Sequence, residues 1–228
     1  MLSKKRLLIF DAYGTLISTG NGSINAVEKI LSLQEKNIDA TAFYRDWKKQ
    51  HRMHMDETNR NIFLTEKDIF IKDLCVLYKQ YQIDRPYEVD VQIMFNSLEN
   101  RVVFPEVINT INQLREKYRV VIGSTTDTTP LLQNMKYNNL VVNEIYTSEM
   151  IQKYKPDPLF YQYILQSEGC VAEETVFIGD SVLDDVVGPR SVGMKTILVD
   201  RKNAYSTIEK NQPDCVVPDI SYLEKMIL

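Results

Sequence analysis

Three features are scarce in this sequence, and each absence excludes a class of protein. The chain has only 3 cysteines, and they form neither a CxxC pair nor a Cys/His pattern, so no cysteine metal site is predicted. Basic residues (27) are fewer than acidic ones (31), and the net charge of -4 excludes a nucleic-acid footprint. Apolar runs are short, so we expect no membrane-spanning segment, and the run after the basic start is too short for the apolar region of a signal peptide.

What is present indicates an ordinary globular protein. The 228 residues suit one core plus an insertion, and a composition of 44% hydrophobic and 25% charged residues allows a sizeable core. Cysteines without a disulfide pattern fit a reducing compartment. We therefore expect a cytoplasmic protein, a monomer or homodimer, that binds a small molecule and neither a membrane nor nucleic acid.

The stretch from Arg6 to Thr15 carries the strongest local pattern. An apolar run of strand length stops at Asp11 and is followed by Tyr13, Gly14 and Thr15. Such a run, bounded by turn residues, is typical of a strand buried on both faces of a parallel sheet. Because ligands bind outside the carboxyl ends of such strands, Asp11 is predicted to lie at the mouth of a site.

From residue 17 to residue 99 the spacing of apolar residues is helical and no strand pattern occurs. Interruptions such as Asp84-Arg85-Pro86 divide this region into four predicted helices, at about 20–37, 41–56, 65–81 and 86–99. A block of helices placed between two strands indicates an inserted helical module. We predict a cap domain over residues 17–99 and a core formed by residues 1–16 plus 100–228.

After residue 100, predicted strands and helices alternate with short connections. This alternation is typical of a doubly wound parallel sheet, which the first strand must join because it could not be stable alone. The sequence therefore predicts an α/β, Rossmann-like core. The strands after the insert are predicted at Arg119–Gly123, Glu144–Thr147, Thr175–Gly179, Lys195–Val199 and Cys215–Val217.

Polar residues follow several of these strands directly. Carboxylates brought together at one sheet edge repel each other unless a proton or a metal lies between them. Hard oxygen ligands in a partly open site suit Mg²⁺, which keeps water ligands and shares phosphate oxygens. The residues concerned are Asp11 with Thr15, Ser124 with Thr125, Asp180 with Ser181, and Lys155 in Lys155-Pro156-Asp157-Pro158.

Four short motifs of this sequence, taken in chain order, resemble those of the haloacid dehalogenase-like (HAD) hydrolase superfamily. The resemblance covers nearly the whole chain, and the insert is similar to the four-helix cap of the C1 type. The first and fourth motifs are specific, and the two others are looser. In chain order they are Asp11-Ala12-Tyr13-Gly14-Thr15-Leu16, Val121-Ile122-Gly123-Ser124, Lys155-Pro156, and Gly179-Asp180-Ser181-Val182-Leu183-Asp184-Asp185.

The resemblance implies a role for each matching residue. Asp11 would be the nucleophile that forms a covalent intermediate. Asp11, Asp180 and the backbone carbonyl of Tyr13 would hold Mg²⁺, and Ser124 and Lys155 would bind anionic oxygens of the substrate.

The resemblance also implies an outer acid of the metal site. Its spacing from Asp180 favours Asp185, although Asp184 stays open as the alternative.

Other residues are predicted to contact an anionic substrate. Three of them follow the strands, namely Gly14, Thr15 and Thr125, and three lie on the second helix of the insert, namely Arg45, Lys48 and His51. Thr15 would also brace the nucleophile loop. For His51 and its neighbour His54, the alternative is a solvated basic helix face.

Tyr13 departs from the pattern of the family's phosphatases, which carry a second Asp at this position. A phenol can donate a proton but is a poor base at neutral pH. Asp-x-Tyr-Gly-Thr also resembles the family's metal-free 2-haloacid dehalogenases, whose fourth motif, however, lacks Gly-Asp-Ser. The favoured hypothesis is a Mg²⁺-dependent phosphatase. The alternatives are a dehalogenase and a weakly active or non-catalytic binding protein.

Overall fold

The computed structural model describes residues 6–34, 36–205 and 212–223, and the chain divides into two compact units. The core unit comprises Met1–Ser18 and Val102–Leu228, and the cap unit comprises Thr19–Arg101. Each boundary lies two residues beyond the position predicted from the sequence.

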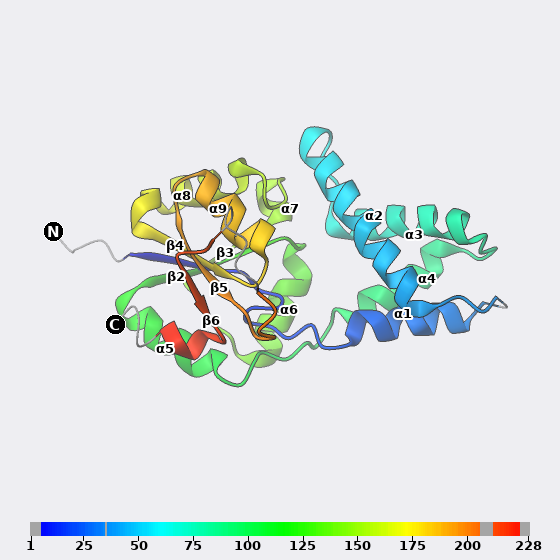
Figure 1. Cartoon of the computed structure of the whole chain (residues 1–228), viewed down its shortest axis with the longest axis horizontal. Coiled ribbons are helices and arrows are strands. Elements are labelled where there is room, and N and C mark those ends of the chain that lie inside the picture. Colours follow the sequence, from blue (N-terminus) through cyan, green and yellow to red (C-terminus); the bar gives the residue numbers. More distant parts are fainter. Residues whose placement is uncertain (1–5, 35, 206–211, 224–228) are drawn as a thin grey trace. The chain divides into compact units, whose positions relative to one another are not determined.

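The core unit is built on a parallel sheet of six strands in the order β3-β2-β1-β4-β5-β6 (Figure 1). This order confirms the predicted α/β, Rossmann-like fold. The apolar runs seen in the sequence become its strands. Their bounds are β1 Leu7–Phe10, β2 Arg119–Ser124, β3 Glu144–Thr147, β4 Thr175–Gly179, β5 Lys195–Val199 and β6 Cys215–Val217.

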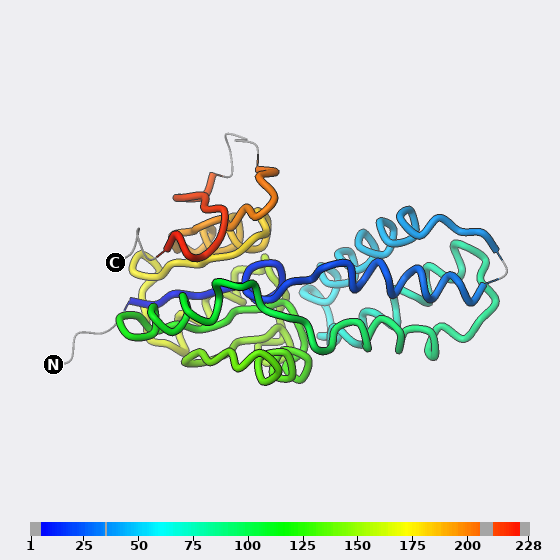
Figure 2. The backbone as a smooth tube through the Cα atoms, turned by 90° about the horizontal axis from the view of Figure 1, so that it is seen from below, coloured from blue at the N-terminus to red at the C-terminus, as the bar shows by residue number. Residues whose placement is uncertain are grey.

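The first strand, β1, is buried on both faces because helices cover the sheet on each side. Leu8 and Phe10 pack with the apolar faces of α5 (Val107–Lys117) and α6 (Thr128–Asn138). Leu7 and Ile9, which point the other way along the pleat, pack against α8 (Pro158–Glu168). Figure 2 shows β1 running through the interior of this unit, with the orange and red segments to one side of it.

The strand register brings the candidate site together. Phe10, the last residue of β1, is in register with Ile122 of β2 and Ile178 of β4. The backbone N–H of Asp11 then donates to the Ile178 carbonyl at 2.8 Å. The residues that follow β1, β2 and β4 therefore emerge at one edge of the sheet.

Short helical segments complete the core unit. A π-helix, η2 (Val182–Val187), follows β4 and leads into α9 (Gly188–Ser191). The other segments are α7 (Ser148–Ile151) and the 3₁₀ turns η1 (Ala172–Glu174) and η3 (Ile220–Tyr222). The sequence also predicted a final helix over residues 220–228, of which residues 224–228 lie outside the described part.

The cap unit consists of four helices around its own apolar core, which includes Val27, Phe43, Trp47, Leu74 and Val91. Local sequence explains where two of these helices begin. Asp39 accepts a hydrogen bond from the Ala42 N–H, and Thr65 and Asp68 form a capping box. The helices are α1 Gly22–Ser32, α2 Ala40–Arg60, α3 Glu66–Tyr81 and α4 Tyr87–Ser97 (Figure 1).

In the described ranges, no helix combines the length and the apolar character that crossing a membrane requires.

Candidate active site

Asp11 and Lys155 form the buried centre of the candidate site. Asp11 directly follows β1, and its side chain accepts a hydrogen bond from Lys155 Nζ at 2.7 Å. The same ammonium donates to Asp185 Oδ1, also at 2.7 Å. Lys155 is 1% exposed, so its charge is held by these carboxylates rather than by solvent.

Asp180 directly follows β4 and is tied to the loop that carries Asp11. Thr15 Oγ1 donates to Asp180 Oδ1 at 3.3 Å. Gly14 has φ +100, and a Cβ at this position would lie 2.3 Å from Asp180 Oδ2. Glycine is therefore required here twice, for its backbone conformation and for the space that the Asp180 carboxylate occupies.

The structure brings Asp185 rather than Asp184 into this cluster. Asp185 accepts from the backbone N–H of Ser181 at 2.9 Å as well as from Lys155. Its carboxylate lies so close to β4 that a Cβ on Gly179 would be 2.2 Å away. Both aspartates lie in the π-helix η2, whose wider turn changes which side chain faces the sheet edge.

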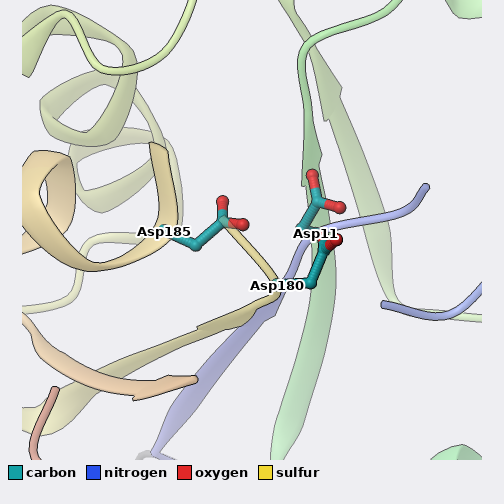
Figure 3. Close-up of side chains that lie close together, drawn as sticks. All are labelled: Asp11, Asp180 and Asp185. Carbon is teal, nitrogen blue, oxygen red and sulfur yellow. The ribbon is translucent and has the colours of Figure 1, made fainter. Parts of the chain in front are cut away.

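Figure 3 shows the three carboxylates of Asp11, Asp180 and Asp185 gathered at the ends of the strands. One oxygen from each lies within 4.8 Å of the others. When all are ionised, the single ammonium of Lys155 leaves two negative charges uncompensated. An excess of this size has to be relieved by protons or by a cation.

The pKa values express this crowding. Burial raises the pKa of Asp11 to about 8, because the charges of Asp185 and Asp180 add to the effect and Lys155 only partly opposes it. Asp180 is exposed as a residue, yet desolvation of its carboxylate and the charge of Asp185 raise its pKa to about 6. Burial alone would lower the pKa of Lys155, but Asp11 and Asp185 raise it above its ordinary value.

The donor set fits a hard divalent cation. The three clustered side chains offer only carboxylate oxygens, which Mg²⁺ prefers to nitrogen or sulfur ligands. A charge of two would also balance the excess that Lys155 leaves. The chemistry and the charge of these residues therefore both suit Mg²⁺.

The Tyr13 side chain is directed into the protein rather than left in solvent. Its ring packs against the core cluster that includes Phe10 and Ile122. Its hydroxyl oxygen accepts a hydrogen bond from Asn134 Nδ2 of α6 at 3.0 Å. The phenol is therefore fixed by a buried amide, a contact that the local sequence around Tyr13 could not reveal.

The other predicted core residues lie at the same sheet edge. Ser124 is buried at the end of β2, in register with Thr147 of β3, and Thr125 follows it and is half-buried. Thr15 is fully buried, and its hydroxyl is used by Asp180. The geometry thus makes Thr15 a brace of the loop.

The predicted cap residues lie on α2, within a unit that is described by itself. Arg45 and Lys48 are exposed, and Lys48 Nζ lies 4.9 Å from the centroid of the Tyr44 ring. His51 is half-buried and stacks on Phe70 with 4.6 Å between the ring centroids.

The alternative of a solvated helix face does not fit His51 and His54, which are half-buried and buried. Their Nδ1 atoms lie 2.7 and 2.5 Å from the two carboxylate oxygens of Asp73. A carboxylate can only accept, so both imidazoles present Nδ1–H to it. Asp73 is fully buried and also accepts from Trp47 Nε1 at 3.2 Å.

Asp73 was missed in the sequence, although a signal for it exists. It lies on α3 four residues after Ile69 and immediately before Leu74, on the apolar face of that helix. An acid on an apolar face predicts a buried carboxylate that needs donors from a neighbouring helix.

Fold and site together define a hydrolase with a buried aspartate at the carboxyl edge of a Rossmann-like sheet. The chain belongs to the haloacid dehalogenase-like hydrolase family, whose model matches residues 5–193. The resemblance seen in the motifs is thereby confirmed.

Several curated relatives with sequence similarity are named as phosphatases. A glyceraldehyde 3-phosphate phosphatase of Methanothermobacter thermautotrophicus is 29% identical over 133 residues, which are 54% of this chain and 58% of the relative. A pyrimidine 5'-nucleotidase, PynA of Streptococcus pneumoniae, is 43% identical over 56 residues, 24% of each chain. The chain spans about half the length of the first curated relatives it matches.

Solved structures show the same fold over the whole chain. The L-2-haloacid dehalogenase of Xanthobacter autotrophicus has a TM-score of 0.80 at 15% identity and 98% coverage of both chains. The HAD hydrolase YfnB of Bacillus subtilis, solved with bound magnesium, has a TM-score of 0.80 at 17% identity and 99% coverage of both chains. At these identities the similarity concerns the fold alone.

Proposed function

We propose that this protein is a Mg²⁺-dependent phosphatase that acts on a small phosphorylated metabolite. The observation that carries the proposal is the charge of the site, where Asp11, Asp180 and Asp185 face a single buried ammonium. A metal-free site of this charge would repel an anionic substrate, whereas a bound divalent cation would make it attractive. The phosphatase names of the sequence relatives support the same reaction.

In this proposal a carboxylate oxygen of Asp11 attacks the phosphorus atom. The new Asp11–phosphorus bond replaces the ester bond, and the alcohol leaves with a proton taken from solvent or a donor. Water then attacks the aspartyl phosphate, which releases inorganic phosphate and restores the carboxylate. Lys155 balances the charge of Asp11 and holds it in place, and the hydroxyls of Ser124 and Thr125 bind phosphoryl oxygens.

The metal would be held by the carboxylates of Asp11 and Asp180 and the backbone carbonyl of Tyr13, with Asp185 as the outer acid. When bound, Mg²⁺ would neutralise charge on the phosphoryl group. Asp185 would act through its hydrogen bonds to Lys155 and to the Ser181 N–H.

Tyr13 leads us to propose a preference among leaving groups. Its phenol oxygen is bound by Asn134, and a phenol is a poor general base. General acid–base help contributes about 10²–10⁴-fold, and a site without a carboxylate at this position loses that help on alkoxide leaving groups. Acyl phosphates and aryl phosphates, whose leaving groups need little protonation, would be the better substrates.

Arg45, Lys48 and His51 of the cap unit stay proposals for substrate selection. His51 is the strongest of the three, because its contacts with Asp73 and Phe70 fix the position of its ring. His54 is the matched control, since its Nε2 is already 2.9 Å from Gln50 Nε2. We expect His51→Ala to raise KM for the preferred substrate more than His54→Gln does.

The test is turnover of p-nitrophenyl phosphate and a panel of metabolite phosphates, with Mg²⁺ and with EDTA. The proposal predicts phosphate release that requires Mg²⁺ and is lost in Asp11→Asn. Activity that EDTA does not change would contradict the proposed Mg²⁺ dependence. A wild type that is inactive on every compound of the panel would contradict the proposed phosphatase activity.

A metal-free 2-haloacid dehalogenase is the second candidate. Tyr13 favours this candidate. A departing halide needs no proton, so the reaction would not require an aspartate at this position. Chloride release from 2-chloropropionate in EDTA tests it directly. Release that exceeds phosphatase turnover would replace the first proposal.

A further inference from the structure

Arg201 lies in the core unit, in the turn that follows β5, and it touches the loop of the nucleophile. Its Nη2 donates to the backbone carbonyl of Thr15 at 2.7 Å and to Glu106 Oε1 at 2.6 Å. Its guanidinium carbon lies 3.6 Å from the centroid of the Phe104 ring. Arg201, Glu106 and Phe104 all lie outside the four motifs that point to the active site, whereas Thr15 belongs to the first of them.

The Thr15 carbonyl is one of the points at which this loop is held from outside, beside the Leu16 carbonyl, which accepts from Phe104 N–H at 3.0 Å. Within the loop, Gly14 N–H donates to Ile17 O and Leu16 N–H to Ala12 O. On its other side the Thr15 hydroxyl donates to Asp180. Thr15 is therefore held between Asp180 through its side chain and Arg201 through its backbone.

The backbone that carries Arg201 is itself fixed. The Asp200 carboxylate accepts from the N–H groups of Ala204 and Tyr205, at 3.0 and 2.8 Å. The Asp200 N–H donates to Val217 O at 2.8 Å, which ties this turn to β6. The guanidinium thus reaches Thr15 from a rigid support on the far strands of the sheet.

Arginine is chemically suited to this place. Its planar fork can stack on Phe104 and donate sideways at the same time, which a lysine ammonium cannot do. The position is also costly, because Arg201 Nε is buried and has no hydrogen-bond partner among the described residues. A guanidinium kept at such a cost points to a role beyond the ion pair with Glu106.

We propose that Arg201 is a positioning residue of the active site, which fixes the Asp11–Thr15 loop by holding the Thr15 carbonyl. Its influence on the reaction rests on the proposed phosphatase function, whereas its hold on the loop does not. A nucleophile displaced by about 1 Å can lose about 10²-fold in rate. Losing Arg201 therefore lowers kcat while substrate contacts, and with them KM, change little.

The experiment compares three variants of the full chain. Arg201→Met removes the donor and keeps an unbranched apolar side chain next to Phe104. Arg201→Lys restores a donor without the fork. Arg119→Met is the matched control, because Arg119 pairs with Glu168 in the same unit but at the start of β2, away from the carboxyl edge.

We expect Arg201→Met to lower kcat about 10- to 100-fold with less than about a threefold change in KM. Arg201→Lys should recover part of that loss, and Arg119→Met should keep kcat within about twofold. A loss of kcat in Arg201→Met no larger than in the control, at comparable thermal stability, would overturn the proposal.

Hydrogen–deuterium exchange of residues 12–18 separates this proposal from the reaction itself. Exchange there should quicken in Arg201→Met and stay unchanged in Arg119→Met, whether or not the wild type releases phosphate. If the wild type lacks phosphatase activity but the variants show this exchange pattern, the proposed function is refuted and the role of Arg201 in holding the loop is retained. Unchanged exchange in Arg201→Met would refute that role.

Discussion

Buried carboxylates occur in both units, and their surroundings differ. In the cap unit, Asp73 accepts from Trp47 and from two imidazoles. Asp90 in the same unit accepts from the Tyr78 hydroxyl at 2.6 Å and from two nitrogens of Arg85, at 3.0 and 2.9 Å. Each of these acids has its own set of donors. In the core unit, Asp11 and Asp185 share the ammonium of Lys155, and Asp180 lies beside them.

The comparison separates structural acids from functional ones. Burial alone would raise the pKa of Asp90, but Arg85 and Tyr78 outweigh it and hold that pKa below its ordinary value. Asp11 lacks such compensation, and its pKa is raised to about 8. Acids supplied with donors stabilise the fold, whereas acids left with excess charge indicate a site that binds a cation or a proton.

The largest effect is expected from Asp11→Asn. Removing the nucleophile should lower phosphate release by about 10⁴-fold or more, because the remaining groups cannot form the covalent intermediate. The variant should nevertheless unfold at a higher temperature than the wild type in EDTA, since one of the crowded charges is gone. Steady-state kinetics and a thermal melt measure the two effects. An Asn variant that retains a tenth of the activity would show that Asp11 is not the nucleophile.

In the cap unit, Asp73→Ala should act on stability instead. It leaves the Trp47 N–H and the His54 imidazole buried without their acceptor, and we expect a loss of about 3 kcal/mol of unfolding free energy. Urea unfolding monitored at Trp47 measures it. Asp180→Asn serves as the matched control, because removing a charge from the crowded site should not destabilise the protein. An equal loss of unfolding free energy in both variants would contradict the distinction between stabilising acids in the cap unit and crowded acids in the core unit.

Mg²⁺ should stabilise the wild type through the core site alone. A ligand that binds only the folded state at a hundred times its Kd adds about 2.7 kcal/mol. We expect a Mg²⁺-dependent rise in melting temperature that is lost in Asp180→Asn and kept in the conservative cap variant Asp73→Asn. A rise of the same size in Asp180→Asn would show that the ion binds elsewhere.

The smallest effect concerns pH in the absence of metal. A carboxyl group with a raised pKa binds its proton more tightly in the folded state, so stability increases as pH falls. For Asp11 and Asp180 this gain should appear between about pH 8 and pH 5. Asp90, with a lowered pKa, acts with the opposite sign and only at lower pH.

Melting temperatures in EDTA across this range should therefore rise toward pH 5 in the wild type and rise less in Asp180→Asn. A wild-type profile that is flat or falls toward pH 5 would contradict the excess negative charge.

The sequence by itself determined the sheet and most of the residues at its carboxyl edge. Apolar runs and their alternation with helices predicted the six parallel strands, and the carboxyl ends of parallel strands must meet at one edge. Asp11 and Asp180, which each directly follow a strand, could therefore be placed at the same edge from the sequence, and the structure shows that their strands are neighbours. The start of α3 could also be predicted from local sequence, since Thr65 and Asp68 form the capping box that their spacing indicates.

Only the tertiary structure decided the remaining contacts. Spacing favoured Asp185 over Asp184, but only the fold places the Asp185 carboxylate against Lys155 and the Ser181 N–H. Asp73 is hydrogen-bonded to side chains of α2, and Arg201 donates to the Thr15 carbonyl, 186 residues away in the sequence. Hydrogen bonds between distant elements depend on how helices and loops pack on the sheet, and no periodicity in the sequence records that packing.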